Sequence, residues 1–132
     1  MKLTLLRYLL MLDAAILLLL GALLIFAPER VEAVFRFDGL PAAVSYLIGL
    51  WGCVFATLGF GYVLAATHPL RHVAWVQVGI ARGSLEFVLG LVYLARGVVV
   101  WQQALFGIVA AGLITVAYVV LYPDRRLATR AA

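Results

Sequence analysis

Two opposite charges stand in the middle of an apolar run, in the segment VGIARGSLEFVLG that covers residues 78–90. Arg82 and Glu86 are four residues apart, so on a helix their side chains share one face and can form an ion pair. Ionisable groups inside a membrane are costly, and they often serve as proton relays or as counter-ions for a substrate. The pair therefore predicts either a binding or relay site or a buried structural ion pair.

A second acid, Asp13, stands in the first apolar segment of the chain. At 1.5 Å per residue, Asp13 lies roughly 9–15 Å from one side of a membrane, and Arg82 lies roughly 15–18 Å from the same side. We therefore expect Asp13, Arg82 and Glu86 to form one charge cluster. The first interpretation is structural: the buried charges fix how the helices pack against one another. Such buried ion pairs often add little net stability. The alternative is a site for a small lipophile or a proton.

The elements that must position these charges are apolar and long. The chain has 132 residues, of which 67% are hydrophobic and 12% are charged, and a mean hydropathy of +1.14. Soluble domains carry about 25% charged residues. Each of four apolar segments has roughly the 20 residues that cross a bilayer, and none alternates as a barrel strand does. These segments cover residues of about 3–26, 41–66, 70–95 and 98–122.

The connections between the segments predict the topology. The last two connections are short, which favours antiparallel neighbours. We therefore expect an all-α fold, an up-down bundle of four transmembrane helices that forms one integral membrane domain over residues 1–132. The connection at 28–38 predicts a short interfacial amphipathic helix, with Pro28 in its first turn and Gly39 as its stop. A plain connector is the alternative for this segment.

The distribution of Lys and Arg predicts the orientation. With four helices, both termini and the 67–72 loop lie on one side. That side carries Lys2, Arg7, Arg71, Arg125, Arg126 and Arg130, and the other side carries Arg30, Arg36 and Arg96. Cytoplasmic loops carry the excess of positive charge. We therefore expect a multi-pass protein of the inner (plasma) membrane, with both termini in the cytoplasm and a basic cytoplasmic tail over 123–132.

Glycines recur along the faces of the last three segments. Gly79 and Gly83 form a GxxxG pair, which allows a second helix backbone to approach closely. The glycines that we expect at helix contacts are Gly49, Gly52, Gly79, Gly83, Gly90 and Gly107. Space for a flat ligand such as a quinone or a sterol-like lipid is the alternative.

Common catalytic templates do not occur in the sequence. It contains no P-loop, GxSxG, HExxH or paired-cysteine motif, so no catalytic residue, metal ligand or cofactor is assigned. Pro69 separates His68 from His72 and breaks the helical geometry by which both could bind one metal or haem. Basic residues are not interleaved with aromatic ones, so nucleic acid is not an expected partner.

The stretch RGSLEFVLGLVYLARG, residues 82–97, has a glutamate followed four and eleven residues later by glycine. With four short-looped helices, it resembles the DoxX-like group of small bacterial membrane proteins. The resemblance implies a bacterial four-helix membrane protein. The basic residue expected beside the outer end of the first helix has no clear counterpart here, so no activity is carried over.

Three classes of function follow. The first is a non-catalytic, structural or accessory subunit, which binds the lipid bilayer and other membrane subunits or copies of itself. The second is a binder or carrier of a small lipophile, quinone-like or lipid-like, or of a proton, through Asp13, Arg82 and Glu86. A membrane enzyme or a small exporter has the least support, because no common catalytic motif occurs and the segment around Asp13 lacks the small, polar face of such exporters.

Overall fold

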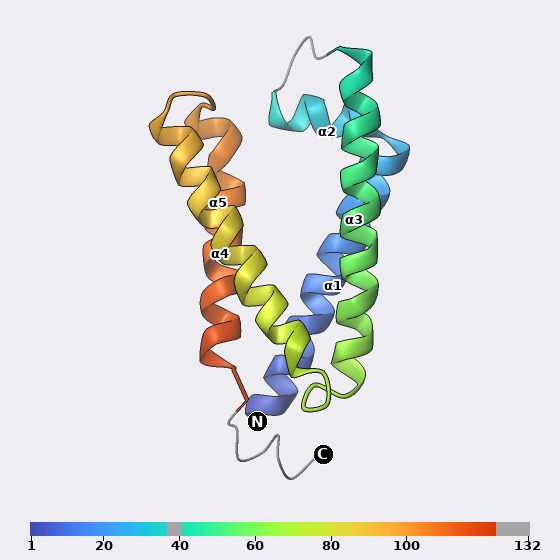
Figure 1. The fold of residues 1–132 in the computed structure, drawn as a ribbon, viewed down its shortest axis with the longest axis vertical. Coiled ribbons are helices and arrows are strands. Elements are labelled where there is room, and N and C mark those ends of the chain that lie inside the picture. The colour runs from blue at the N-terminus through green and yellow to red at the C-terminus, as the bar shows by residue number, and fades with distance from the viewer. Residues whose placement is uncertain (37–40, 124–132) are drawn as a thin grey trace. The chain divides into compact units, whose positions relative to one another are not determined.

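The computed structural model describes residues 1–36 and 41–123. The helices within these ranges are α1 (Lys2–Phe26), α2 (Pro28–Phe35), α3 (Ala42–Thr67), α4 (Val73–Ala95) and α5 (Trp101–Val120), and no strand occurs in them (Figure 1). Four helices are long and the second is short. The predicted all-α fold, with four long apolar helices and a short helix after the first, is confirmed.

The four long helices, α1, α3, α4 and α5, have 20 to 26 residues each. At 1.5 Å per residue this is about 30–39 Å, enough for a hydrocarbon core about 30 Å thick. Their large apolar side chains are widely exposed, as at Leu19 (66%), Leu85 (71%) and Phe106 (75%). Apolar surface of this extent marks contact with lipid or with other protein. Each of the four helices can therefore cross a membrane.

The described residues fall into two compact units. One unit contains residues 1–10 and 65–123, and the other contains residues 11–64. The second unit holds most of α1, all of α2 and most of α3. The first unit holds the start of α1, the last turn of α3, and the helices α4 and α5.

Small residues bring α1 and α3 together in the unit 11–64. A Cβ on Gly21 would lie 2.8 Å from the carbonyl oxygen of Gly52, and one on Gly59 would lie 2.8 Å from Cγ of Leu18. These distances are too short for any side chain, so the backbones are in direct contact at Gly21 and Gly52, and the side chain of Leu18 packs against Gly59. Gly49 is different, because a Cβ there would meet nothing within 4 Å.

The short helix α2 ends earlier than the sequence predicted. Pro28 occupies its first turn as expected, but the helix stops at Phe35. Arg36 adopts a left-handed conformation with φ of 58°, and its N–H donates to the carbonyl oxygen of Ala33 at 3.2 Å. That bond satisfies one of the last carbonyls of the helix. The predicted stop, Gly39, lies outside the described residues.

The turns around α4 are longer than predicted. α4 begins at Val73 rather than at residue 70, because the N–H of Arg71 donates to the carbonyl of His68 at 3.0 Å and closes a turn. α5 begins at Trp101 rather than at residue 98. Gly97 takes a φ of +67° that ends α4. The resulting turn over 96–100 sets which residues of α5 face α4.

Candidate functional site

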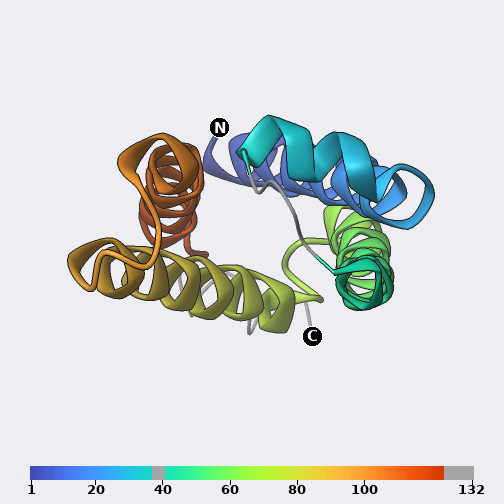
Figure 2. The same cartoon turned by 90° about the horizontal axis from the view of Figure 1, so that it is seen from above.

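The helices α4 and α5 pack against each other as an antiparallel hairpin (Figure 1), and Figure 2 shows them from above, α4 in yellow-green and α5 in orange. Glycines on α4 receive larger side chains from α5. The facing pairs are Gly79 with Tyr118, Gly83 with Thr115, and Gly90 with Ile108. A Cβ on Gly79 would lie 2.6 Å from the ring of Tyr118, which is fully buried. This interlocking fixes the register of the hairpin and thereby the face on which the charges of α4 lie.

Polar contacts support the same hairpin. The side-chain amide of Gln77 donates to the hydroxyl oxygen of Tyr122 at 2.8 Å, which links the start of α4 to the residues after α5. The hydroxyl of Thr115 donates to the carbonyl of Ala111 on its own helix at 2.7 Å, as hydroxyl groups on membrane helices commonly do. The hydroxyl of Thr115 therefore has its hydrogen-bond partner within α5 itself.

Arg82 and Glu86 flank Ser84, the midpoint of α4. Nε of Arg82 lies 3.9 Å from Oε1 of Glu86. This distance is longer than that of a charge-assisted hydrogen bond, which measures about 2.7–2.9 Å. An arginine that precedes the glutamate is also the weaker order on a helix. The two side chains differ in burial, with 12% of Arg82 exposed and 46% of Glu86 exposed. The carboxylate is therefore the accessible member of the pair.

Glu86 forms one end of a groove between α4 and α5. The groove has a volume of about 320 Å³ and is lined by Glu86, Leu89, Gly90, Tyr93, Val99, Gln103, Ala104, Gly107 and Ile108. Gly107 leaves it open, because a Cβ there would meet nothing within 4 Å. The groove is mainly apolar, with Tyr93 and Gln103 as polar members besides the acid. It can accept an apolar chain or ring with a polar group beside the carboxylate.

Gln103 was not among the candidate residues from the sequence. Its side-chain oxygen accepts from the N–H of Val100 at 3.0 Å, so it caps the start of α5 and lies at the groove. The feature of the sequence that could have identified Gln103 is a glutamine near the start of an apolar segment. Its place opposite α4 depends on the turn over 96–100, which the sequence predicted to be shorter.

Asp13 belongs to the other unit, on the part of α1 within residues 11–64. It is buried, with 1% of its surface exposed. Its predicted meeting with Arg82 joins residues of different units and stays a prediction.

A metal site requires several ligands in one place. Among residues 1–36 and 41–123, no group of three or more His, Cys, Asp and Glu side chains is placed to hold a metal ion. The side chains that line the α4–α5 groove provide one carboxylate and neutral polar groups.

Comparisons with family models, with curated proteins and with solved structures found no match to this chain. The resemblance to DoxX-like proteins accordingly stays a hypothesis from the sequence, and the function has to be argued from the site itself.

Proposed function

We propose that this chain is a multi-pass protein of the inner (plasma) membrane with both termini in the cytoplasm. Four helices of sufficient length and apolarity support the multi-pass part. The excess of Lys and Arg on the side of the termini supports the orientation. Three of the six basic residues on that side, Arg125, Arg126 and Arg130, belong to the tail over 123–132.

Reporter fusions test this orientation. A green fluorescent protein after residue 132 should fluoresce, because it folds in the cytoplasm. Alkaline phosphatase inserted in the 96–100 turn should be active, because that turn lies on the outer side. The reverse pattern would show that the chain is inserted the other way round.

Within the membrane, we infer a non-catalytic role as an accessory subunit that assembles with another membrane protein or with copies of itself. The half-exposed carboxylate of Glu86 carries this inference. Glu86 lies nine residues before the end of α4, about 14 Å along the helix axis. A glutamate side chain is too short to reach the interface from that depth. In contact with lipid, a charge near the helix centre costs about 2.5–3.5 kcal/mol.

A second helix that covers the groove would remove this cost. Gly107 leaves room for close approach of a backbone, and Tyr93 offers a further polar partner. A hydroxyl, amide or guanidinium of the covering helix would bind the Glu86 carboxylate. Hydrogen bonds to charged groups contribute about 1.5–3 kcal/mol. The bond between the covering helix and Glu86 would then fix the position of that helix along α4.

The substitution Glu86→Gln tests the assembly. It keeps the shape of the side chain and removes the charge, so we expect the ratio of co-purified partner to this chain in mild detergent to fall about ten- to hundredfold. Glu29→Gln is the matched control, because Glu29 is an exposed acid on α2. Equal recovery of the partner with both variants would refute a role of Glu86 in assembly.

The groove itself favours a second candidate function, the binding of a small lipophile. Its volume of about 320 Å³ lies at the lower end of small-molecule sites, which measure about 300–1,000 Å³. A quinone-like or lipid-like molecule with a hydrogen-bond donor would place its polar group at Glu86. Organic extraction of the purified protein distinguishes the two candidates. A lipophile retained by the native chain and lost in Glu86→Gln, with no protein partner, would favour this second function.

A further inference from the structure

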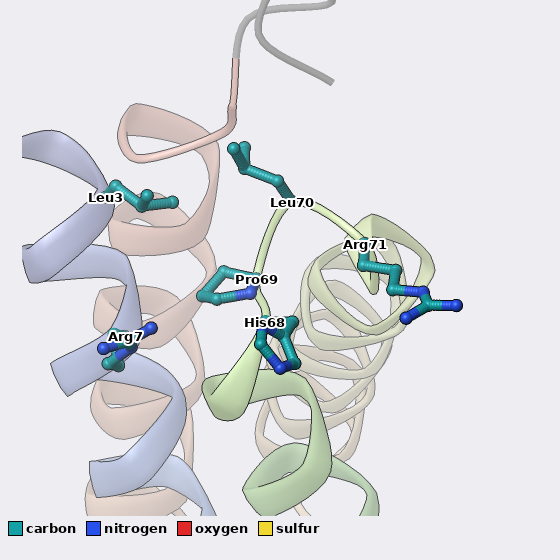
Figure 3. Close-up of a pocket in the computed structure, with 6 residues that line it drawn as sticks. All are labelled: Leu3, Arg7, His68, Pro69, Leu70 and Arg71. Atoms are coloured by element: carbon teal, nitrogen blue, oxygen red, sulfur yellow. The ribbon is translucent and has the colours of Figure 1, made fainter. Parts of the chain in front are cut away.

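A second cavity lies at the opposite end of the same unit from the Glu86 groove. It has a volume of about 320 Å³ and is lined by Leu3, Arg7, His68, Pro69, Leu70 and Arg71 (Figure 3). Leu3 and Arg7 come from the first turns of α1, and the other four residues come from the turn between α3 and α4. Three of its six residues have basic side chains, whereas the Glu86 groove has none.

Arg7 is held in place at this cavity. Its guanidinium donates to the carbonyl oxygen of Thr67, the last residue of α3, at 3.0 Å. The last carbonyls of a helix have no partner within it, so this bond serves α3 as well. A guanidinium has five N–H donors in a planar fork. One bond to Thr67 leaves further donors, and a fork of this kind matches the oxygens of a phosphate group.

The turn presents the other basic residues on a defined backbone. Both the N–H of Arg71 and the N–H of His72 donate to the carbonyl of His68, at 3.0 and 3.2 Å, and Pro69 is buried. In Figure 3, Pro69 and Leu70 lie between the two arginines, and the guanidinium of Arg71 points outward. Because Arg71 is exposed and has a long side chain, its guanidinium can rotate towards an anion bound above the turn.

No acidic side chain lines this cavity. Glu86 is the only acid among the described residues of this unit, 1–10 and 65–123, and it lies 13 residues beyond the start of α4. Asp124 lies outside the described residues. Lys2 adds a further positive charge, since it lines an adjoining cavity of about 120 Å³. An anion is therefore the complementary ligand.

Apolar walls point to the source of the anion. Leu3 and Leu70 line both this cavity and the adjoining one, which also contains Leu6, Leu121, Tyr122 and Pro123. Both cavities lie at the ends of long apolar helices, where the headgroups of a bilayer lie. Basic pockets between membrane helices bind lipid headgroups through such a combination of charge and apolar surface. A free phosphate ion would use the arginines but not the leucines.

We propose that this cavity binds the phosphate group of an anionic phospholipid. Arg7 supplies the fixed fork, Arg71 and Lys2 add positive charge, and the leucines contact the first part of an acyl chain. The proposal rests on the membrane location proposed above, but it is independent of Glu86 and of the assembly argued from it. Recovery of the protein from the membrane fraction checks that location separately.

Native mass spectrometry of the detergent-purified chain, titrated with phosphatidylglycerol or phosphatidylcholine, tests the proposal. We expect phosphatidylglycerol to bind more tightly. Each arginine near an anionic lipid contributes a factor of about five. Arg71→Gln should therefore weaken phosphatidylglycerol binding about fivefold, and Arg7→Gln with Arg71→Gln about 25-fold. The matched control is Arg30→Gln with Arg96→Gln, which removes the same charge elsewhere and should leave binding unchanged.

Three outcomes would overturn the proposal. Equal binding of the two lipids would show that charge plays no part. Equal losses in the double variant and its control would show that net charge acts rather than this cavity. Displacement of phosphatidylglycerol by millimolar inorganic phosphate, dependent on Arg7 and Arg71, would assign the cavity to free phosphate. Arg71→Gln alters only an exposed side chain, so its effect on binding decides the matter even if the double variant fails to fold.

Discussion

At the scale of single residues, the glycines of the α4–α5 hairpin are not equivalent. Gly79 lies against the buried ring of Tyr118, whereas Gly107 faces open space in the groove. The sequence predicted both as packing positions, since helical periodicity identifies a face but not what covers it. What covers each glycine depends on the register of α5, and the 96–100 turn sets that register.

The contrast between these two glycines predicts a difference in stability. Replacement of glycine by alanine stabilises a helix by about 1 kcal/mol at either position, because alanine has the higher helix propensity. At Gly79 the new methyl group would also overlap the Tyr118 ring, and overpacking of this kind costs about 1–3 kcal/mol. We therefore expect Gly79→Ala to unfold more easily in detergent than Gly107→Ala by about 1–3 kcal/mol, measured by denaturant titration. Equal stability of the two variants would contradict the tight contact at Gly79.

The charges of α4 show how far the position and the exposure of single side chains can be predicted from the sequence. The spacing of Arg82 and Glu86 places them on one face of any helix, and they lie 3.9 Å apart. Their unequal exposure could not be predicted, because it depends on which side chains pack against α4 and not on the spacing of the two charges. The accessible carboxylate is nevertheless what the proposed assembly requires.

At the scale of elements, the chain's composition predicts which segments are helical, and local backbone chemistry decides where they end. α1, α3, α4 and α5 all lie within three residues of their predicted bounds. The deviations occur at turns. Arg36 and Gly97, both with positive φ, end α2 and α4. A left-handed residue is easy to predict at Gly97 but not at Arg36, because most side chains disfavour it.

The end of α4 provides a prediction at this scale. Gly97 has a φ of +67°, and the following N–H, of Val98, donates to the carbonyl of Tyr93 at 3.1 Å. A Cβ in this conformation costs about 1–2 kcal/mol. Gly97→Ala should therefore destabilise the hairpin by about that amount and speed amide hydrogen exchange in the 96–100 turn. An unchanged exchange rate and stability would show that the turn does not need glycine. Gly107→Ala is the control.

At the scale of the whole molecule, four helices are long and apolar enough to cross a membrane, and the proposed functions depend on the few charged residues. The large apolar side chains of these helices are suited to lipid. The number of spanning segments could be predicted because it depends only on length and hydropathy. The meeting of Asp13 with Arg82 depends on packing between helices of different units, which hydropathy does not encode.

The central claim is that another membrane protein or a second copy covers the Glu86 face of α4. A photoreactive residue in place of Leu89, which lines the groove, tests it directly in native membranes. Val88 is the matched control, since it is 56% exposed, nearly as much as Leu89 at 57%, and does not line the groove. We predict a protein adduct at position 89 that falls at least tenfold in Glu86→Gln, and none at position 88. Equal adducts at both positions, or none at 89, would contradict the claim.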